Sequence, residues 1–120
     1  GAAGLMQLMP DTASRTAREL DTGVGNIYDI DKNIELGAGH FGMLIKETGS
    51  VYAALAAYNA GAHNVKKWLA RCRCEDMDEF VEDIPYKETK GYIKRIFTSY
   101  YRYRRYVDGN ADGRRISVFQ

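Results

Sequence analysis

The sequence predicts an all-α fold, and two observations carry that prediction. Apolar residues recur at intervals of three and four along most of the chain, which is the spacing of one face of a helix. Only two prolines, Pro10 and Pro85, interrupt this pattern. Because 120 residues that are 45% hydrophobic can bury one core and hardly two, we expect a single compact domain.

The first helix is expected to begin at Pro10, since proline suits the first helical position and Asp11 and Thr12 are good capping residues. Its apolar face comprises Ala13, Ala17 and Leu20. The turn formers of residues 21–26 end this helix.

The second helix is expected to follow Asp29 or Asp31, either of which can cap it. Its apolar positions are Ile34, Ala38, Phe41, Leu44 and Ile45. Three glycines, Gly37, Gly39 and Gly42, lie in the same segment. Each glycine costs a helix about 1 kcal/mol relative to alanine, so we expect another backbone to pack closely against them.

The third helix, Val51–Ala60, is capped by Ser50 and is nearly all small or apolar. A helix that is apolar on all sides is predicted to be the buried, central one. Gly61 ends it, and a shorter amphipathic helix with Val65, Trp68 and Leu69 follows. We expect a fifth short helix over residues 77–81 and the longest helix over residues 86–107.

Charge and cysteine content exclude several classes of protein. Lysine and arginine (17) nearly balance aspartate and glutamate (16), so no whole-chain field favours a polyanionic partner. The two cysteines, Cys72 and Cys74, are separated by one residue, which makes a bridge between them strained. His40 and His63 have no zinc-type spacing to this pair. We therefore expect two ordinary thiols, no metal site and no cofactor.

Four short motifs occur in a fixed order along the chain. The first is G-L-M-Q-L-M-P at residues 4–10, and the second is I-Y-D at residues 27–29 with N-I at 33–34. The third is A-A-Y-N-A-G at residues 56–61, and the last is I-P-Y at residues 84–86 with E-T at 88–89. Taken singly, each motif fits a core stripe or a helix end. Together they resemble the soluble lytic transglycosylase catalytic domain.

The resemblance implies a lysozyme-like helical fold of the goose-type lysozyme kind, with residues 1–107 forming part of the catalytic domain. It also implies a cleft that binds glycan strands and in which the β-1,4 bond between N-acetylmuramic acid and N-acetylglucosamine is cleaved non-hydrolytically. One glutamic acid protonates the glycosidic oxygen, and its conjugate base then helps the muramyl C6 hydroxyl attack C1, leaving a 1,6-anhydro end. A nucleophile tethered to the sugar needs no second, water-activating carboxylate.

The substrate-binding residues that the resemblance implies are Met6, Gln7, Tyr58, Asn59, Glu88 and Tyr92. Met6 would supply an apolar wall, the amides of Gln7 and Asn59 would bind sugar polar groups, and Tyr58 would offer a stacking face and a hydroxyl. Glu88 and Tyr92 lie four apart on one helix face. Glu88 is equally well interpreted as a solvated carboxylate in the first turn of a helix, where the helix dipole favours it.

No residue of this chain matches the catalytic glutamate, which in the family precedes the G-L-M-Q segment on an earlier helix. We therefore expect that glutamate in the sequence upstream of this chain. Without it, the chain would be inactive and would expose apolar surface. The alternatives are a non-catalytic glycan-binding module, a hydrolytic goose-type lysozyme relative, and a nucleic-acid or phage-associated domain. The last rests only on the tyrosines and arginines of residues 100–106, which we interpret as helix packing with snorkelling arginines.

The C-terminal residues 108–120 are expected to form a turn and a short extended tail. Residues 108–113 match the first half of an EF-hand loop, but Arg115 and Phe119 break the second half, so we expect no calcium site. No apolar stretch approaches the about 20 residues that span a bilayer, and no signal peptide is visible. The resemblance implies peptidoglycan glycan strands as partner, no nucleic acid, a monomer, and a bacterial envelope, periplasmic or secreted location.

Overall fold

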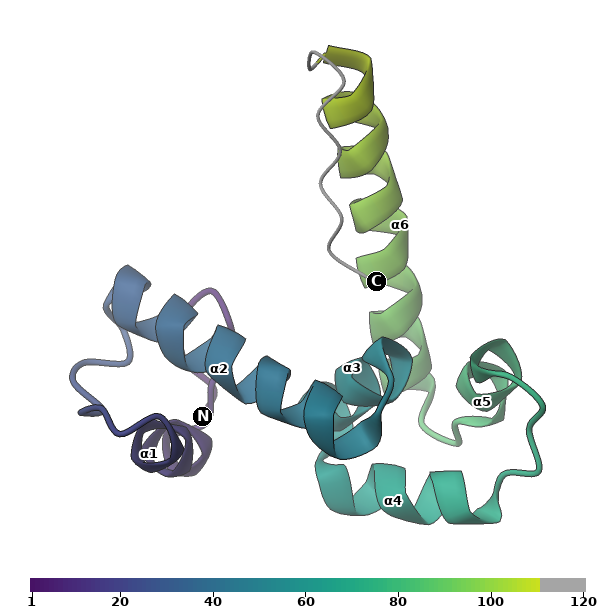
Figure 1. The fold of residues 1–120 in the computed structure, drawn as a ribbon, viewed down its shortest axis with the longest axis horizontal. Coiled ribbons are helices and arrows are strands. Elements are labelled where there is room, and N and C mark those ends of the chain that lie inside the picture. The colour runs from purple at the N-terminus through teal and green to yellow at the C-terminus, as the bar shows by residue number, and fades with distance from the viewer. Residues whose placement is uncertain (111–120) are drawn as a thin grey trace. The chain divides into compact units, whose positions relative to one another are not determined.

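The computed structural model describes residues 1–110, and within them every regular element is a helix (Figure 1). The helices are α1 (Pro10–Glu19), α2 (Ile30–Thr48), α3 (Val51–Ala60), α4 (Ala62–Arg71), α5 (Met77–Asp83) and α6 (Lys87–Asn110). The all-α prediction is confirmed. None of these helices is both long and apolar enough to cross a membrane.

The chain divides into two compact units, Gly1–Gly49 and a second that begins at Ser50. We expected one domain with one core. The division arises because α1 packs with α2, whereas α3 packs with α4, α5 and α6. Helical periodicity shows which face of a helix is apolar but not which helix covers that face, so the sequence alone did not predict this grouping.

The core of the first unit joins α1, α2 and the turn that precedes α1. Its buried members are Leu8, Ala13, Ala17 and Leu36. Helix α1 begins with a proline at its first position. Helix α2 is capped by Asp29, whose side chain accepts a hydrogen bond from the backbone N–H of Lys32 at 3.0 Å. Asp29, and not Asp31, is therefore the cap. Gly49 ends α2 with a left-handed backbone (φ 74°).

Glycines in α2 allow close packing, but the partners are side chains, which corrects the expectation of a second backbone. A Cβ atom on Gly37 would lie 2.5 Å from Met6 Cβ, and one on Gly39 would lie 2.6 Å from Leu20 Cδ1. Nothing lies within 4 Å of the corresponding position on Gly42. The missing side chain at Gly37 thus makes room for Met6, whereas Gly42 has no such role.

The second unit is built around α3, as predicted for the helix that is apolar on all sides. Residues 53–57 of α3 are all buried. The Ser50 side chain accepts from Ala53 N–H at 3.4 Å, and Gly61 follows the last residue. Aromatic pairs hold the neighbouring segments. Tyr52 stacks on Phe97 of α6 with ring centroids 4.6 Å apart, and Trp68 and Tyr86 form a T-shaped pair with centroids 5.0 Å apart.

Cys72 and Cys74 are joined by a disulfide, so the prediction of two ordinary thiols is wrong. Their Cα atoms are 5.3 Å apart, which is within the range of about 4.4 to 6.8 Å that disulfides use. The residues lie in the segment between α4 and α5, where the extended backbone at Cys72 brings the two side chains together. One intervening residue is therefore no barrier to pairing here.

Helix α6 extends to Asn110, three residues beyond the predicted end at Val107. Arg104 Nε lies 3.6 Å from Asp108 Oδ2, one helical turn later, and this ion pair lies in the last turns of the helix. Asp108 and Gly109 are therefore helical and not part of a turn. The remaining C-terminal expectations, namely the second half of the EF-hand-like loop and the extended tail, lie outside the described residues.

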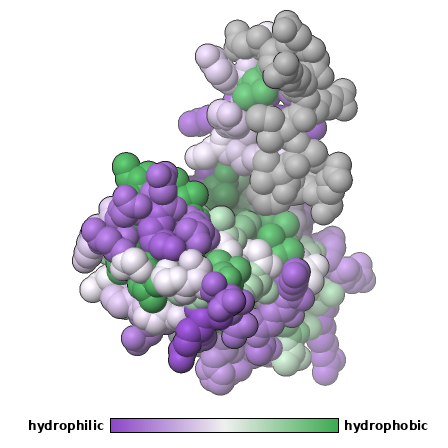
Figure 2. All heavy atoms as spheres, turned by 60° about the vertical axis from the view of Figure 1, so that its left-hand side comes forward, coloured by the Kyte–Doolittle hydropathy of each residue, from purple (hydrophilic) through white to green (hydrophobic). Residues whose placement is uncertain are grey.

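Large apolar and aromatic side chains are exposed in both units. On the face that Figure 2 draws, green hydrophobic atoms lie beside purple hydrophilic ones. Leu5 is 71% exposed and Tyr28 is 74% exposed in the first unit. In α6, Tyr101, Tyr103 and Tyr106 are exposed too, so these three tyrosines lie on the flanks of the helix.

Replacement of Gly37 by alanine should lower the free energy of unfolding by about 1–3 kcal/mol, because the added methyl group displaces Met6. The matched control is Gly42→Ala in the same helix. With open space around it, that change should raise stability by up to about 1 kcal/mol. Urea unfolding followed by circular dichroism measures both, and equal shifts in one direction would contradict the packing role of Gly37.

Candidate functional site

The buried amide of Asn33 organises the candidate residues of the first unit. Its Oδ1 accepts from the backbone N–H of Met6 at 2.8 Å, and its Nδ2 donates to the carbonyls of Ala3 and Ile27, both at 2.8 Å. The side chain is 1% exposed. Three hydrogen bonds from one amide therefore connect the turn before α1 to the loop before α2.

Gly4 makes this arrangement possible. A Cβ atom at Gly4 would lie 2.5 Å from Asn33 Nδ2, and the backbone there is left-handed (φ 72°). Any other residue would both strain the backbone and displace the amide. The first and second sequence motifs are thus physically joined, because the glycine of one accommodates the asparagine of the other.

Gln7 lies on a tight turn in which Ala3 and Leu8 exchange backbone hydrogen bonds of 2.8 and 3.0 Å. Gln7 has φ 50°, a left-handed conformation that costs a non-glycine residue about 1–2 kcal/mol. Its side-chain Nε2 donates to the Gly4 carbonyl at 2.8 Å. The turn therefore presents Gln7 at the surface while Met6 is half-buried against α2.

The end of α3 and the start of α6 bring together the candidate residues of the second unit. Asn59 Oδ1 accepts from the Thr89 hydroxyl at 2.7 Å. Thr89 is 1% exposed, so this hydrogen bond lies against the core. It fixes the position of the Asn59 amide relative to α6, and Tyr92 lies on the next turn of the same helix.

Tyr58 and Tyr92 are half-buried and interact electrostatically. Burial, and secondarily the neighbouring Tyr92, raises the pKa of Tyr58 to about 12. Burial also raises the pKa of Tyr92 above its usual value. Both phenols therefore keep their protons at neutral pH, and each can donate one hydrogen bond to a ligand and accept others.

Glu88 is exposed in the first turn of α6. The helix dipole favours a carboxylate there, which agrees with the solvated-face reading of this residue. Thr89, the next residue, is hydrogen-bonded to Asn59, but the Glu88 side chain itself is exposed to solvent. Among the predicted residues of the second unit, Tyr58, Asn59 and Tyr92 form the group with defined partners.

Sequence reasoning missed Asn33 and Thr89, although both belong to the quoted motifs. Asn33 is a polar residue on the apolar face of α2, and Thr89 lies beside a residue that was singled out for its charge. A buried polar side chain requires a partner, so polar positions on apolar helix faces are the signal that could have found them. Met6 is 27 residues from Asn33, and Asn59 is 30 residues from Thr89, so these partners are far away in sequence.

Replacement of Thr89 by valine should lower the free energy of unfolding by about 1–2 kcal/mol, because the Asn59 oxygen loses its hydroxyl donor. Thr89→Ser keeps the donor and should recover part of the loss. Thr98→Val is the matched control, since its exposed hydroxyl donates to the carbonyl of Lys94 in its own helix. Equal urea midpoints for the two valine variants would show that the Asn59–Thr89 hydrogen bond adds no stability.

Comparison with known proteins places the chain in one family. The model of the transglycosylase SLT domain matches residues 1–81. The soluble lytic murein transglycosylase of Escherichia coli (strain K12) is 37% identical over 112 residues, which cover 86% of this chain and 17% of that protein. The transglycosylase of Enterobacteria phage PRD1 is 41% identical over 73 residues, which cover 61% of this chain and 25% of that protein.

A solved structure gives the same result. It is an inactive mutant of the lytic transglycosylase Slt from Pseudomonas aeruginosa, with a TM-score of 0.82 and 32% sequence identity. The match covers 99% of this chain and 21% of that one, so the chain spans about a fifth of the length of this protein. The expected lysozyme-like helical fold is confirmed. The chain belongs to the transglycosylase SLT domain family.

Proposed function

We propose that this chain is the glycan-binding part of the catalytic domain of a peptidoglycan lytic transglycosylase. Family membership supports the reaction class. The observation that carries the assignment of the site is the Asn59–Thr89 hydrogen bond, which fixes an amide between α3 and α6, the two helices that carry the protonated phenols of Tyr58 and Tyr92. Oriented amides and neutral hydroxyls are the groups that bind the acetamido and hydroxyl groups of amino sugars.

The proposed reaction cleaves the bond between N-acetylmuramic acid and N-acetylglucosamine and forms a 1,6-anhydro end. The muramyl C6 hydroxyl attacks C1 of the same sugar, so the strand must be held in a geometry that brings these atoms together. Tyr58 would donate its hydroxyl hydrogen bond to a sugar oxygen near the reacting centre, and the Asn59 amide would bind an acetamido group. Gln7 and Met6 would contact the strand from the turn before α1.

The acid that protonates the leaving oxygen is proposed to come from sequence upstream of Gly1. The glutamates of this chain do not occupy the position that the family's acid holds before the G-L-M-Q segment. Residues 1–107 would then bind and orient the strand, while Glu88, exposed at the start of α6, would contact it through its carboxylate. We further propose action in the bacterial envelope, periplasmic or secreted, by a monomer.

Mass spectrometry of purified peptidoglycan tests this function. The chain and the same chain extended at its N-terminus by its gene-encoded sequence are incubated with glycan strands in parallel. We expect anhydromuramyl products from the extended form alone. Products with reducing ends would instead identify a hydrolase, and strand binding without cleavage by either form would identify a glycan-binding module.

Tyr58→Phe in the extended form should lower kcat/KM roughly tenfold to a hundredfold, because a neutral donor in a half-buried site is removed without a change of shape. Tyr28→Phe is the control, since Tyr28 is 74% exposed and lies in the loop before α2. Rates of anhydromuramyl release measure both variants. Equal rates for the two would remove the Tyr58 hydroxyl from the site.

A further inference from the structure

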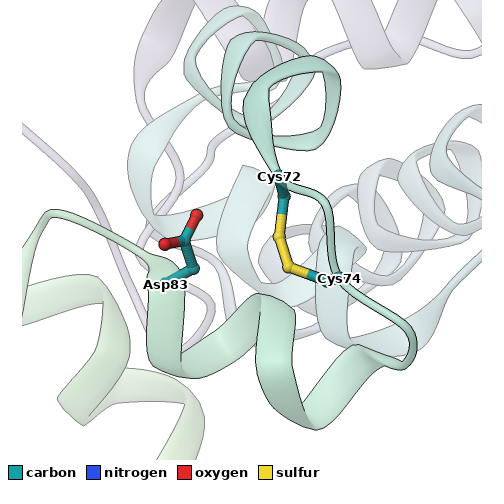
Figure 3. A group of neighbouring side chains, drawn as sticks. All are labelled: Cys72, Cys74 and Asp83. Atoms are coloured by element: carbon teal, nitrogen blue, oxygen red, sulfur yellow. A yellow bond between two sulfur atoms is a disulfide. The ribbon is translucent and has the colours of Figure 1, made fainter.

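The segment between α4 and α5 carries a group of metal-ligating atoms outside the proposed glycan site. The sulfur atoms of Cys72 and Cys74 and a carboxylate oxygen of Asp83 all lie within 4.8 Å of one another. Figure 3 shows Asp83, the last residue of α5, beside the disulfide. The sequence alone did not suggest this group, because its third member, Asp83, comes from the next helix.

We propose that reduction of this disulfide creates a site for one thiophilic divalent cation, of which Zn²⁺ is the natural representative. The two thiolates and the Asp83 carboxylate are ligands that zinc uses in proteins, and water would complete a tetrahedron. Zinc–sulfur bonds of about 2.3 Å require the sulfurs to lie about 3.8 Å apart. Side chains on Cα atoms 5.3 Å apart reach that separation by rotation about their Cα–Cβ bonds.

Accessibility and charge support the site. Both cysteines are half-buried, and Asp83 is exposed, so a reductant and an ion can reach the group. A surface hollow beside the disulfide is lined by Arg71, Arg73, Glu79 and Asp83 as well as the cysteines. The carboxylates of this hollow attract the cation, and the arginines balance their charge.

Asp83 also belongs to an acidic face of α5. A second hollow is lined by four carboxylates, those of Asp78, Glu79, Glu82 and Asp83. Two of them have other partners, since Glu79 accepts from Glu75 N–H at 3.1 Å and Glu82 lies 2.8 Å from Lys94 Nζ. Asp83 is the one within reach of both sulfurs.

The chemistry couples metal binding to redox state. The disulfide takes up two electrons and two protons to give two thiols, and a water-soluble phosphine supplies the electrons while it gains one oxygen atom from water. Zn²⁺ then displaces the two thiol protons as it binds. Hydrogen peroxide reverses the process: it removes two electrons and two protons from the dithiol, is reduced to two waters, and so closes the site to the ion.

Titration of the phosphine-reduced, untagged chain with Co²⁺ tests the proposal, because Co²⁺ reports its ligands by absorption. We expect one equivalent to give a thiolate-to-cobalt charge-transfer band in the near ultraviolet and visible bands of a tetrahedral ion, and Zn²⁺ to abolish both. The oxidised chain should show neither. Absence of the thiolate band from the reduced chain would overturn the proposal.

Variants test whether Asp83 binds the ion together with the two thiolates or whether the thiolates bind it without Asp83. Cys72→Ser with Cys74→Ser should abolish the thiolate band, and Asp83→Asn should weaken Zn²⁺ binding by about tenfold or more in competition with a chromogenic chelator. Asp78→Asn is the matched control, since it removes one charge from the same helix outside the group and should leave affinity within about twofold. Equal affinities of the two asparagine variants would overturn the role of Asp83.

A chemical measurement on the unsubstituted chain supplies an independent check. In the reduced chain, Zn²⁺ should protect Cys72 and Cys74 together from alkylation by iodoacetamide, as counted by mass spectrometry. Mg²⁺, which prefers oxygen ligands and is a poor partner for thiolates, should give no protection. Alkylation of both cysteines at the same rate with and without Zn²⁺ would overturn the proposal even if every variant folds.

Discussion

A side-chain amide that connects distant segments is the interaction on which each unit depends. In the first unit the Asn33 side chain bonds to backbone groups of two earlier segments, the turn before α1 and the loop before α2, and in the second unit Asn59 accepts from Thr89. Removing a partner from such a buried bond leaves a desolvated polar group, which costs more than the bond itself contributes. Each amide therefore serves packing and the placement of candidate binding residues at once.

The conformation of Gln7 follows from the first of these amides. A left-handed backbone at a residue with a side chain persists only where its surroundings determine it. Here Asn33 holds the preceding N–H, and Gly4 lies at the other end of the same turn. The cost of the Gln7 conformation is thus offset by bonds that its neighbours make, and the strained residue is one that the family resemblance associates with substrate.

Local features of the fold were predictable, whereas pairings across the chain were not. The caps at Asp29 and Ser50 and the bounds of α3 follow from turn and helix chemistry within a few residues. The Asn59–Thr89 bond, the contact of Gly37 with Met6 and the approach of Asp83 to the cysteines join residues far apart in sequence, and periodicity does not specify such contacts. The same limit explains why the motifs suggested Met6 and Asn59 as candidates but did not suggest Asn33 and Thr89, to which they are hydrogen-bonded.

The composition of α3 limits the substitutions that its buried positions can accept, because larger side chains do not fit there. Four of the five residues in its buried stretch 53–57 are alanines, so the helix already presents nearly the smallest side chains that a core can hold. Such a surface cannot lose volume, and nearly every substitution must push its neighbours outward. Sequence drift at these four alanines is therefore restricted to exchanges among the smallest residues, while the larger side chains that pack around them retain freedom to change shape in compensation.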